Sequence, residues 1–306
     1  MMTMPTFYMP VALCEDDQEN ITEELRAGGA AVFKLAEYEK QITFTDDENR
    51  IRETARKNIT RDIRQALKAG KDVVFVELAL SASMRKDILD RINLPAAKTC
   101  CILTARQYAN CLALNASRND PRPEKEMKKR YHRIDIPHSH EGWDEIRIVY
   151  PDSDQYSLGD PFAFAEKLMD FQQDNPHHLE TLGEHLRMTY DNLKGEADLL
   201  RLAGLMHDFG KVSTKDFHNG RGEPTEIAHY YNHEHTGAYD SLFFDTAGYD
   251  PLHLAFLINY HMLPHDWRRN YSAKGPAKKE KLWGKELLDE VMRLAEADDK
   301  AKRNND

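Results

Sequence analysis

Two kinds of segment alternate along the first half of the chain. Short apolar runs, typical of buried strands, are separated by longer stretches with apolar residues at helical spacing. The runs that predict strands are residues 6–13, 30–35, 72–80, 98–105 and 144–151. The stretches that predict helices are residues 19–29, 45–71, 81–93 and 105–117. Strands that alternate with helices predict a parallel sheet with helices on both faces.

The pattern changes in the region 150–164, where Pro, Asp, Ser and Gly gather. No strand-like run of comparable quality follows, and the rest of the chain predicts helices only. These helices are residues 162–173, 179–193, 196–209, 233–244, 251–261 and 285–302. We therefore expect two domains, an α/β domain over residues 1–155 and an all-α domain over residues 156–306.

The composition fits a protein with packed cores, since 41% of the 306 residues are hydrophobic. A net charge of −10 argues against general nucleic-acid binding through bulk charge, although a local basic groove is compatible with it. The apolar runs are too short to span a membrane, and the N-terminus lacks the pattern of a signal peptide. None of the four cysteines forms a CxxC pair, so we expect a reduced, cytoplasmic protein.

The stretch "LMHDFGK" (residues 205–211) carries the first sign of chemistry. An apolar helix ends there on His207 and Asp208, although a helix C-terminus favours cations and disfavours carboxylates. A metal ion beside Asp208 would explain this placement. Further imidazole and carboxylate side chains occur on the other predicted helices of this half, and such groups suit divalent metals. They are His185, His229, His233, His261 and Asp298.

The order of these residues resembles that of the HD superfamily of metal-dependent phosphohydrolases. His185, the pair His207-Asp208 and Asp298 match the first His, the HD pair and the last Asp of that family. The context, "NPHH" at residues 175–178, "HYYNHE" and "AEAD", is similar to the branch that includes the HD domains of tRNA nucleotidyltransferases. The resemblance covers about residues 160–302.

The resemblance implies one divalent ion at His185, His207, Asp208 and Asp298, where bound water would become a nucleophile toward phosphorus. His233 and His261 occupy positions where some members bind a second metal; otherwise they would bind phosphate or protonate the leaving oxygen. The ion or ions would be Mn, Ni, Fe, Zn, Co or Mg.

Three further residues are predicted to meet the substrate. Lys211 would neutralise charge on the phosphoryl oxygens and is, with Asp208, a predicted catalytic residue. His178 and His229 are predicted substrate-binding residues. If His229 and His233 lay on one helix, their spacing of four residues would place them on a common face.

The first half resembles the P-loop kinases that include polynucleotide 5′-hydroxyl kinases. The similar stretches are "SASMRKDIL" at 81–89, "LTARQYANCLALNASR" at 103–118 and "EGWDEIRIVYP" at 141–151. However, the phosphate-binding GxxxxGK[ST] motif that such kinases need is missing. Ala12, Glu15, Gln18 and Glu19 stand where its glycines, Lys and Ser belong. The two following motifs are lost as well, at residues 32–40 and 76–79, so the resemblance implies a pseudokinase.

Basic residues remain in the region that corresponds to the kinase lid. They are Arg118, Arg122, Lys125, Lys128, Lys129, Arg130 and Arg133. They form either a polynucleotide contact surface or a solvated helix face. The domain could also serve in docking or in a homodimer.

Together these features predict a metal-dependent phosphohydrolase that acts on nucleotides or RNA terminal phosphates through its second half. The alternative is a non-catalytic nucleotide or RNA sensor with a structural metal. A kinase with an unusual phosphate loop is a third, weaker option.

Overall fold

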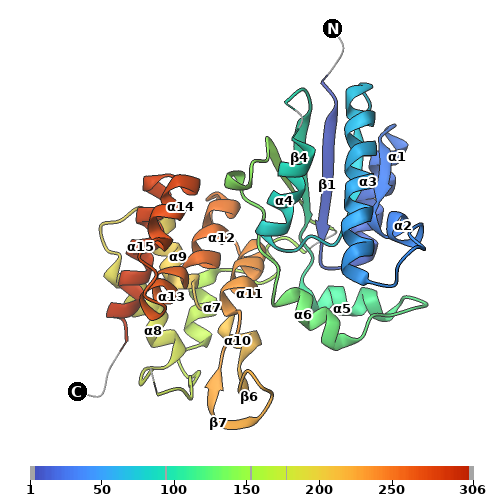
Figure 1. The fold of residues 1–306 in the computed structure, drawn as a ribbon. Coiled ribbons are helices and arrows are strands. Elements are labelled where there is room, and N and C mark those ends of the chain that lie inside the picture. The colour runs from blue at the N-terminus through green and yellow to red at the C-terminus, as the bar shows by residue number, and fades with distance from the viewer. Residues whose placement is uncertain (1–3, 94, 152–153, 177, 303–306) are drawn as a thin grey trace. The chain divides into compact units, whose positions relative to one another are not determined.

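The computed structural model describes residues 4–93, 95–151, 154–176 and 178–302 (Figure 1). The chain divides into two compact units. The first comprises the described residues of 1–127 and 137–151, and the second those of 128–136 and 152–306. Residues 128–136 thus pack with the second unit although they precede residue 155. The domain boundary at that residue stays a prediction.

The first unit is built on a five-stranded sheet in the order β2-β3-β1-β4-β5. Every neighbouring pair of strands is parallel, as predicted. The strands are β1 (Thr6–Ala12), β2 (Ala31–Lys34), β3 (Val73–Val76), β4 (Lys98–Thr104) and β5 (Glu145–Val149). Phe7 and Met9 on β1 and Cys101 and Leu103 on β4 are fully buried, so the centre of the sheet is the core of this unit.

Helices link the strands in the way that parallel pairing requires. They are α1 (Glu15–Ala27), α2 (Leu35–Lys40), α3 (Glu48–Lys68), α4 (Ala82–Ile92), α5 (Tyr108–Ala116), α6 (Glu124–Tyr131) and the short η1 (Ser139–Glu141). The long α3 begins where the Asp47 carboxylate accepts hydrogen bonds from the backbone N–H groups of Asn49 and Arg50. Its buried residues recur every four positions, which gives the helix one face toward the core.

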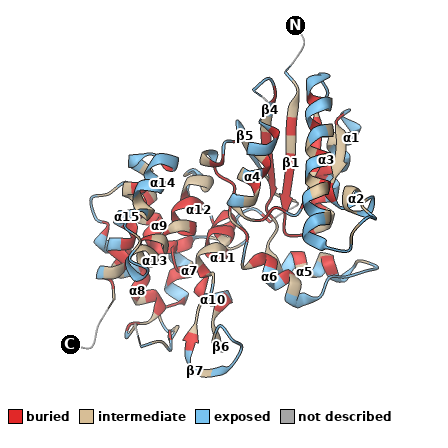
Figure 2. Cartoon of the chain, viewed as in Figure 1, coloured by how far each residue is buried: buried red, intermediate tan, exposed pale blue. Residues whose placement is uncertain are grey.

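The second unit is mainly helical, as predicted. Its helices are α7 (Pro161–Lys167), α8 (Leu182–Asn192), α9 (Asp198–Met206), α10 (Lys211–Thr214), α11 (His233–Asp240), η2 (Ser241–Phe243), α12 (Pro251–Tyr260), α13 (Leu263–Arg269), α14 (Gly275–Trp283) and α15 (Lys285–Lys300). The central α12 is buried at six consecutive positions, 254–259, and other helices surround it (Figure 2). Among the described residues, none of the helices is both long and apolar enough to span a bilayer.

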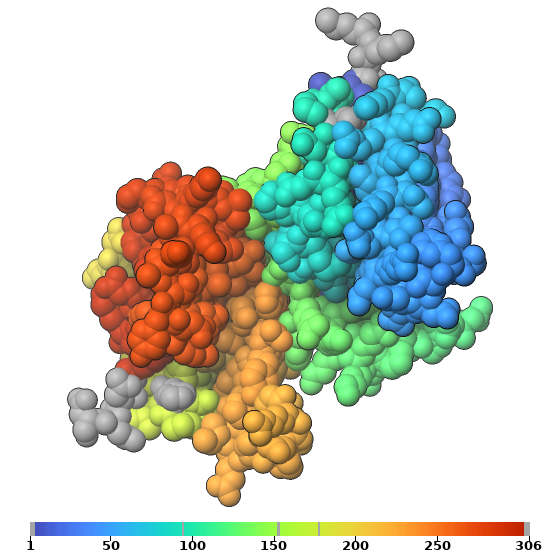
Figure 3. All heavy atoms as spheres, in the orientation of Figure 1, coloured from blue at the N-terminus to red at the C-terminus, as the bar shows by residue number. Residues whose placement is uncertain are grey.

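The prediction that this half contains helices only is wrong, and the condition for a shared helix face of His229 and His233 is not met. A two-stranded antiparallel hairpin, β6 (Asp216–His218) and β7 (Pro224–His229), extends from the helices (Figures 1 and 3). Its strands are short and mostly exposed, so they lack the apolar alternation that marks a strand in sequence. His229 therefore ends a strand rather than sharing a helix face with His233. Asn232, at a left-handed φ of 61°, separates the two residues.

Candidate metal centre

The six residues predicted as metal ligands lie together inside the second unit. Their side chains come from the ends or interiors of five helices, and all are buried. They are His185 on α8, His207 and Asp208 at the end of α9, His233 at the start of α11, His261 at the end of α12 and Asp298 on α15.

A close approach of two backbone segments fixes the position of the His207-Asp208 turn. At Gly210 an added Cβ would lie 2.0 Å from the carbonyl oxygen of His233 and 2.5 Å from the hydroxyl of Thr236. Only glycine fits this contact, which brings the end of α9 against the start of α11. The glycine of "HDFGK" therefore places Asp208 beside His233.

One group of donor atoms surrounds Oδ2 of Asp208. Nε2 of His185 lies 3.1 Å from Oδ1 of Asp298, 3.3 Å from Nε2 of His207 and 3.4 Å from Oδ2 of Asp208. Nε2 of His207 lies 3.3 Å from the same Asp208 oxygen. Ligand distances of about 2.1 Å in a tetrahedral site place neighbouring donor atoms about 3.4 Å apart. The observed spacing fits one divalent ion.

A second group surrounds the other oxygen of the same carboxylate. Nε2 of His233 lies 3.0 Å from Oδ1 of Asp208, and Nε2 of His261 lies 3.7 Å from it. The two imidazole nitrogens are 3.3 Å apart. Asp208 thus presents one oxygen to each group of histidines, an arrangement that suits a carboxylate shared by two ions.

The outer nitrogens of three of these imidazoles face backbone carbonyls. Nδ1 of His207 lies 2.9 Å from the carbonyl oxygen of Gly204. Nδ1 of His233 lies 2.8 Å from that of Tyr230, and Nδ1 of His261 lies 2.7 Å from that of Ile258. A carbonyl oxygen only accepts, so Nδ1 donates in each pair, and in the neutral imidazole Nε2 is the nitrogen left to bind a metal. Three imidazole Nε2 atoms therefore face a buried carboxylate, a donor set that suits a cation.

The electrostatics favour charged carboxylates at this depth. Burial alone would raise the pKa of Asp208, but Lys211 and His207 outweigh it and hold that pKa well below its ordinary value. Asp298 behaves in the same way: burial opposes its ionisation, and the hydrogen bonds from His185 and His265 lower its pKa well below the usual range. Both carboxylates are therefore available as anionic ligands at neutral pH.

Lys211 lies at the edge of the cluster. Its ammonium group is 2.7 Å from Oδ2 of Asp208, donates to Oε1 of the Gln173 amide at 2.9 Å, and is 3.5 Å from Nε2 of His178. Burial, together with Lys211 and His185, lowers the pKa of His178 to about 4. His178 is therefore neutral at physiological pH and adds no positive charge beside Lys211.

Two further residues support these ligands, although the sequence analysis did not identify them. The buried Glu180 lies 2.7 Å from Nδ1 of His178 and 3.3 Å from Nδ1 of His185. Nε2 of His265, on α13, lies 2.9 Å from Oδ2 of Asp298. The only sequence signal for His265 was its spacing of four residues from His261.

His229 lies apart from this cluster. Its ring stacks on that of Tyr231, with the centroids 5.3 Å apart and the planes within 7°. Within the described part of the chain, no hydrogen bond, ion pair or ring contact joins it to the six candidate ligand residues. His177, which precedes His178 in the "NPHH" motif, lies outside the described residues.

The first unit holds a different kind of polar cluster at the start of α1. Arg106 binds Asp17 with two hydrogen bonds of 2.8 and 2.9 Å, and Arg118 binds Asp16 at 2.6 Å. Arg122 donates to Glu15 at 2.9 Å. Carboxylates are favourable at a helix N-terminus, which is where a kinase of this kind would hold phosphate. Arg118 and Arg122, two of the predicted basic surface residues, are thus paired within the unit.

Comparison with known proteins gives a family for the second half only. No curated protein matches the chain. Among solved structures it is similar to a gluconokinase from Sinorhizobium meliloti 1021, at 14% sequence identity and a TM-score of 0.36, over 49% of this chain and 85% of that one. Residues 177–302 match the family model of the HD domain. The part of the chain that carries all six clustered candidate ligands is therefore an HD domain.

Proposed function

We propose that this protein is a metal-dependent phosphohydrolase that acts on nucleotides or RNA terminal phosphates through its HD domain. HD domains bind divalent metals, and the family consists mainly of hydrolases. The observation that carries the proposal is the convergence of imidazole Nε2 atoms from four histidines on the two oxygens of Asp208. Packing alone does not account for such a set of buried polar atoms, because burying polar groups costs free energy unless each has a partner. A bound cation would be that partner.

His185, His207, Asp208 and Asp298 would hold one ion, and His233 and His261 would hold a second through the other oxygen of Asp208. A bound ion supplies Lewis acidity and a water of lowered pKa. Mn, Ni, Fe, Zn, Co and Mg all remain candidates, because imidazole and carboxylate ligands accept each of them.

The remaining polar residues would act on the phosphate. Lys211 is a buried cation beside Asp208, so it is placed to neutralise charge that develops on a phosphoryl oxygen. Gln173 and the neutral His178 hold its ammonium group in position. His178 would also donate to or accept from the substrate, and His229 would contact its more distant part.

The substrate class rests on two resemblances, the polynucleotide-kinase-like first half and the HD branch found with tRNA nucleotidyltransferases. Such association is an analogy at the level of fold. For the first unit we propose a scaffold without kinase activity, since its own carboxylates pair with Arg106 and with Arg118 and Arg122 of the lid region. Assembly as a homodimer and a cytoplasmic location belong to the same proposal.

The test combines elemental analysis with phosphate release. The purified chain and an EDTA-treated sample are assayed on 2′-, 3′- and 5′-nucleotides, 2′,3′-cyclic nucleotides, phosphorylated RNA ends and bis(p-nitrophenyl) phosphate, with each metal added back. We expect metal-dependent release that disappears in His207→Ala and Asp208→Ala and persists in His218→Ala, a change on the exposed hairpin. Release that persists in both site variants would refute the proposal, and bound metal without turnover would favour the sensor.

A further inference from the structure

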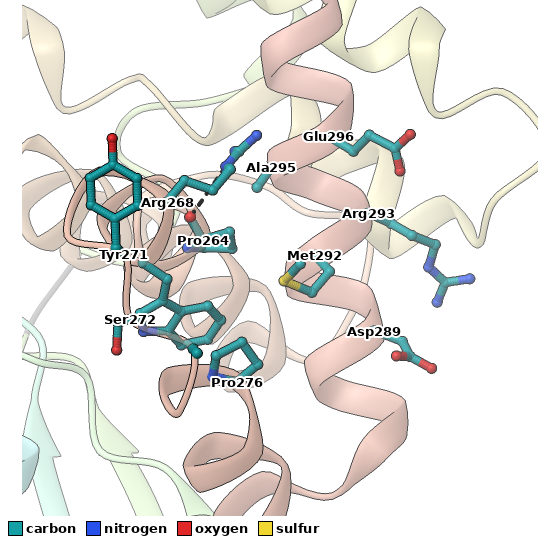
Figure 4. Close-up of a pocket in the computed structure, with 12 residues that line it drawn as sticks. Pro264, Arg268, Tyr271, Ser272, Pro276, Asp289, Met292, Arg293, Ala295 and Glu296 are labelled. Carbon is teal, nitrogen blue, oxygen red and sulfur yellow. Dashed lines mark hydrogen bonds between the residues drawn. The ribbon is translucent and has the colours of Figure 1, made fainter.

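A pocket of about 860 Å³ lies on the HD domain between α13 and α15. Its volume is in the range of sites for small molecules. Figure 4 shows Pro264 and Tyr271 on one side, the latter in the loop after α13, and Met292 and Ala295 of α15 on the other. Nothing in the proposed hydrolytic chemistry uses this pocket.

Aromatic and apolar groups form most of its surface. Trp267 and Tyr271 contribute rings, while Pro264, Pro276 and Met292 contribute flat or polarisable apolar contacts. Charged groups of both signs stand around them, namely Arg268, Arg293, Asp289 and Glu296. Flat aromatic surfaces with hydrogen-bonding groups at the rim suit a planar heterocycle, which stacks on rings and presents polar edges.

The ring of Trp267 is held by its surroundings, and that of Tyr271 is exposed. At Gly275 an added Cβ would lie 2.5 Å from Cδ1 and 2.6 Å from Nε1 of Trp267, so α14 begins in direct contact with the indole. Tyr271 has a left-handed φ of 49° and is 94% exposed. A bulky residue adopts this backbone conformation rarely, and such conformations gather at ligand-binding sites. The fold thus keeps an aromatic ring in water at the mouth of the pocket.

Arg268 connects the pocket with the metal centre. It lines the pocket and forms an ion pair with Asp299, the neighbour of the ligand Asp298. His265, one turn before it on α13, contacts Asp298 directly. Along α15, Ala295 and Met292 precede Asp298 by three and six residues, or about 4.5 and 9 Å at 1.5 Å per residue. This span is comparable to the length of one nucleoside.

We propose that this pocket binds the base of a nucleoside whose phosphate lies at the metal centre. The inference rests on the proposed function for the phosphate, whereas the base-binding site itself is testable without turnover. In this proposal Trp267, Tyr271 and Met292 are the residues that make the site prefer nucleotides to other phosphate esters.

The test measures binding of adenosine, which carries no phosphate, to the metal-free full-length chain by titration calorimetry. Base stacking on an aromatic side chain is lost on substitution by alanine, so Trp267→Ala and Tyr271→Ala should each weaken binding by at least about fivefold. Tyr271→Ala is the decisive variant, because so exposed a side chain contributes little to folding. Tyr156→Ala is the matched control: Tyr156 is also an exposed tyrosine at a left-handed φ, 59°, and does not line the pocket.

Adenosine binding that falls in both pocket variants and persists in Tyr156→Ala would support the proposal. No binding by the parent chain, or equal binding by all four proteins, would overturn it. Phosphate release from 2′-, 3′- and 5′-AMP is measured in parallel. If phosphate is released but the pocket variants bind adenosine like the parent chain, the base site alone is refuted. If adenosine binding depends on the pocket but no phosphate is released, the hydrolase alone is refuted.

Discussion

Nε2 of His265 lies 2.9 Å from Oδ2 of Asp298, while the other oxygen of that carboxylate lies 3.1 Å from Nε2 of His185. The opposite nitrogen of His265, Nδ1, lies 3.3 Å from Asp299, and Asp299 in turn binds Lys302 at 2.8 Å. Both oxygens of Asp298 are thus oriented, one by a predicted ligand and one by a residue outside the ligand set. Partners of this kind fix a ligand's direction before a metal arrives.

Replacing His265 by glutamine should therefore weaken metal binding. Loss of an orienting partner typically lowers metal affinity by about 10–100-fold. We expect a decrease in that range, measured by competition with a chromophoric chelator, and little change in the unfolding of the metal-free chain. His253→Gln is the control, since His253 pairs with Glu290 at 2.8 Å and contacts none of the ligand residues. Equal affinities in the two variants would show that His265 does not position Asp298.

The number of bound ions should depend on the pair His233 and His261. If Asp208 is shared by two ions, the parent chain binds two per molecule, and His261→Gln retains one, because the donors around Oδ2 are intact. Elemental analysis after dialysis gives the stoichiometry. His218→Gln, on the exposed hairpin, should keep both ions. A parent chain that holds a single ion would exclude the second site.

The sequence predicted the fold class because each element that builds it carries a strong pattern. β1 and β4 are buried along most of their length, and α3 repeats its buried residues every four positions. The hairpin and α13 escaped prediction because they are short and mostly not buried. A hydrophobic pattern identifies a helix or strand in sequence only when the element is long enough and buried on one face.

The candidate site was only partly predictable for a related reason. The six clustered residues were found through the order of a family motif, which spacing alone would not have supplied. Glu180 precedes α8 and lies on no periodic face, so nothing marked it. The pairing of Arg118 with Asp16 joins residues 102 positions apart, and a charge run gives no information about partners at that distance.

The ion pair between Asp17 and Arg106 should stabilise the first unit. Asp17 is 3% exposed and is held by two hydrogen bonds from the guanidinium group, so Asp17→Asn leaves a cation poorly paired. Breaking a buried pair typically costs about 3–5 kcal/mol, and we expect a loss near the lower value in urea unfolding. Glu126→Gln is the control, because Glu126 and Arg122 are 3.7 Å apart on the surface, where such pairs contribute little. A loss no larger than that of the control would refute a stabilising role.

Asp240 should make the stability of the HD domain depend on pH. Burial raises the pKa of this carboxyl from 3.8 to about 7, although the hydroxyl of Tyr131 donates to it at 2.5 Å and opposes the shift. Since the folded state then binds the proton more tightly than the unfolded state, the contribution of Asp240 is fully present below pH 3.8 and is lost as the pH rises through 7. We expect the unfolding free energy of the parent chain, relative to Asp240→Asn, to fall across this window in urea titrations. Asp245→Asn, a change at an exposed carboxyl, should follow the parent chain. Parallel curves for the parent chain and Asp240→Asn would contradict the assignment.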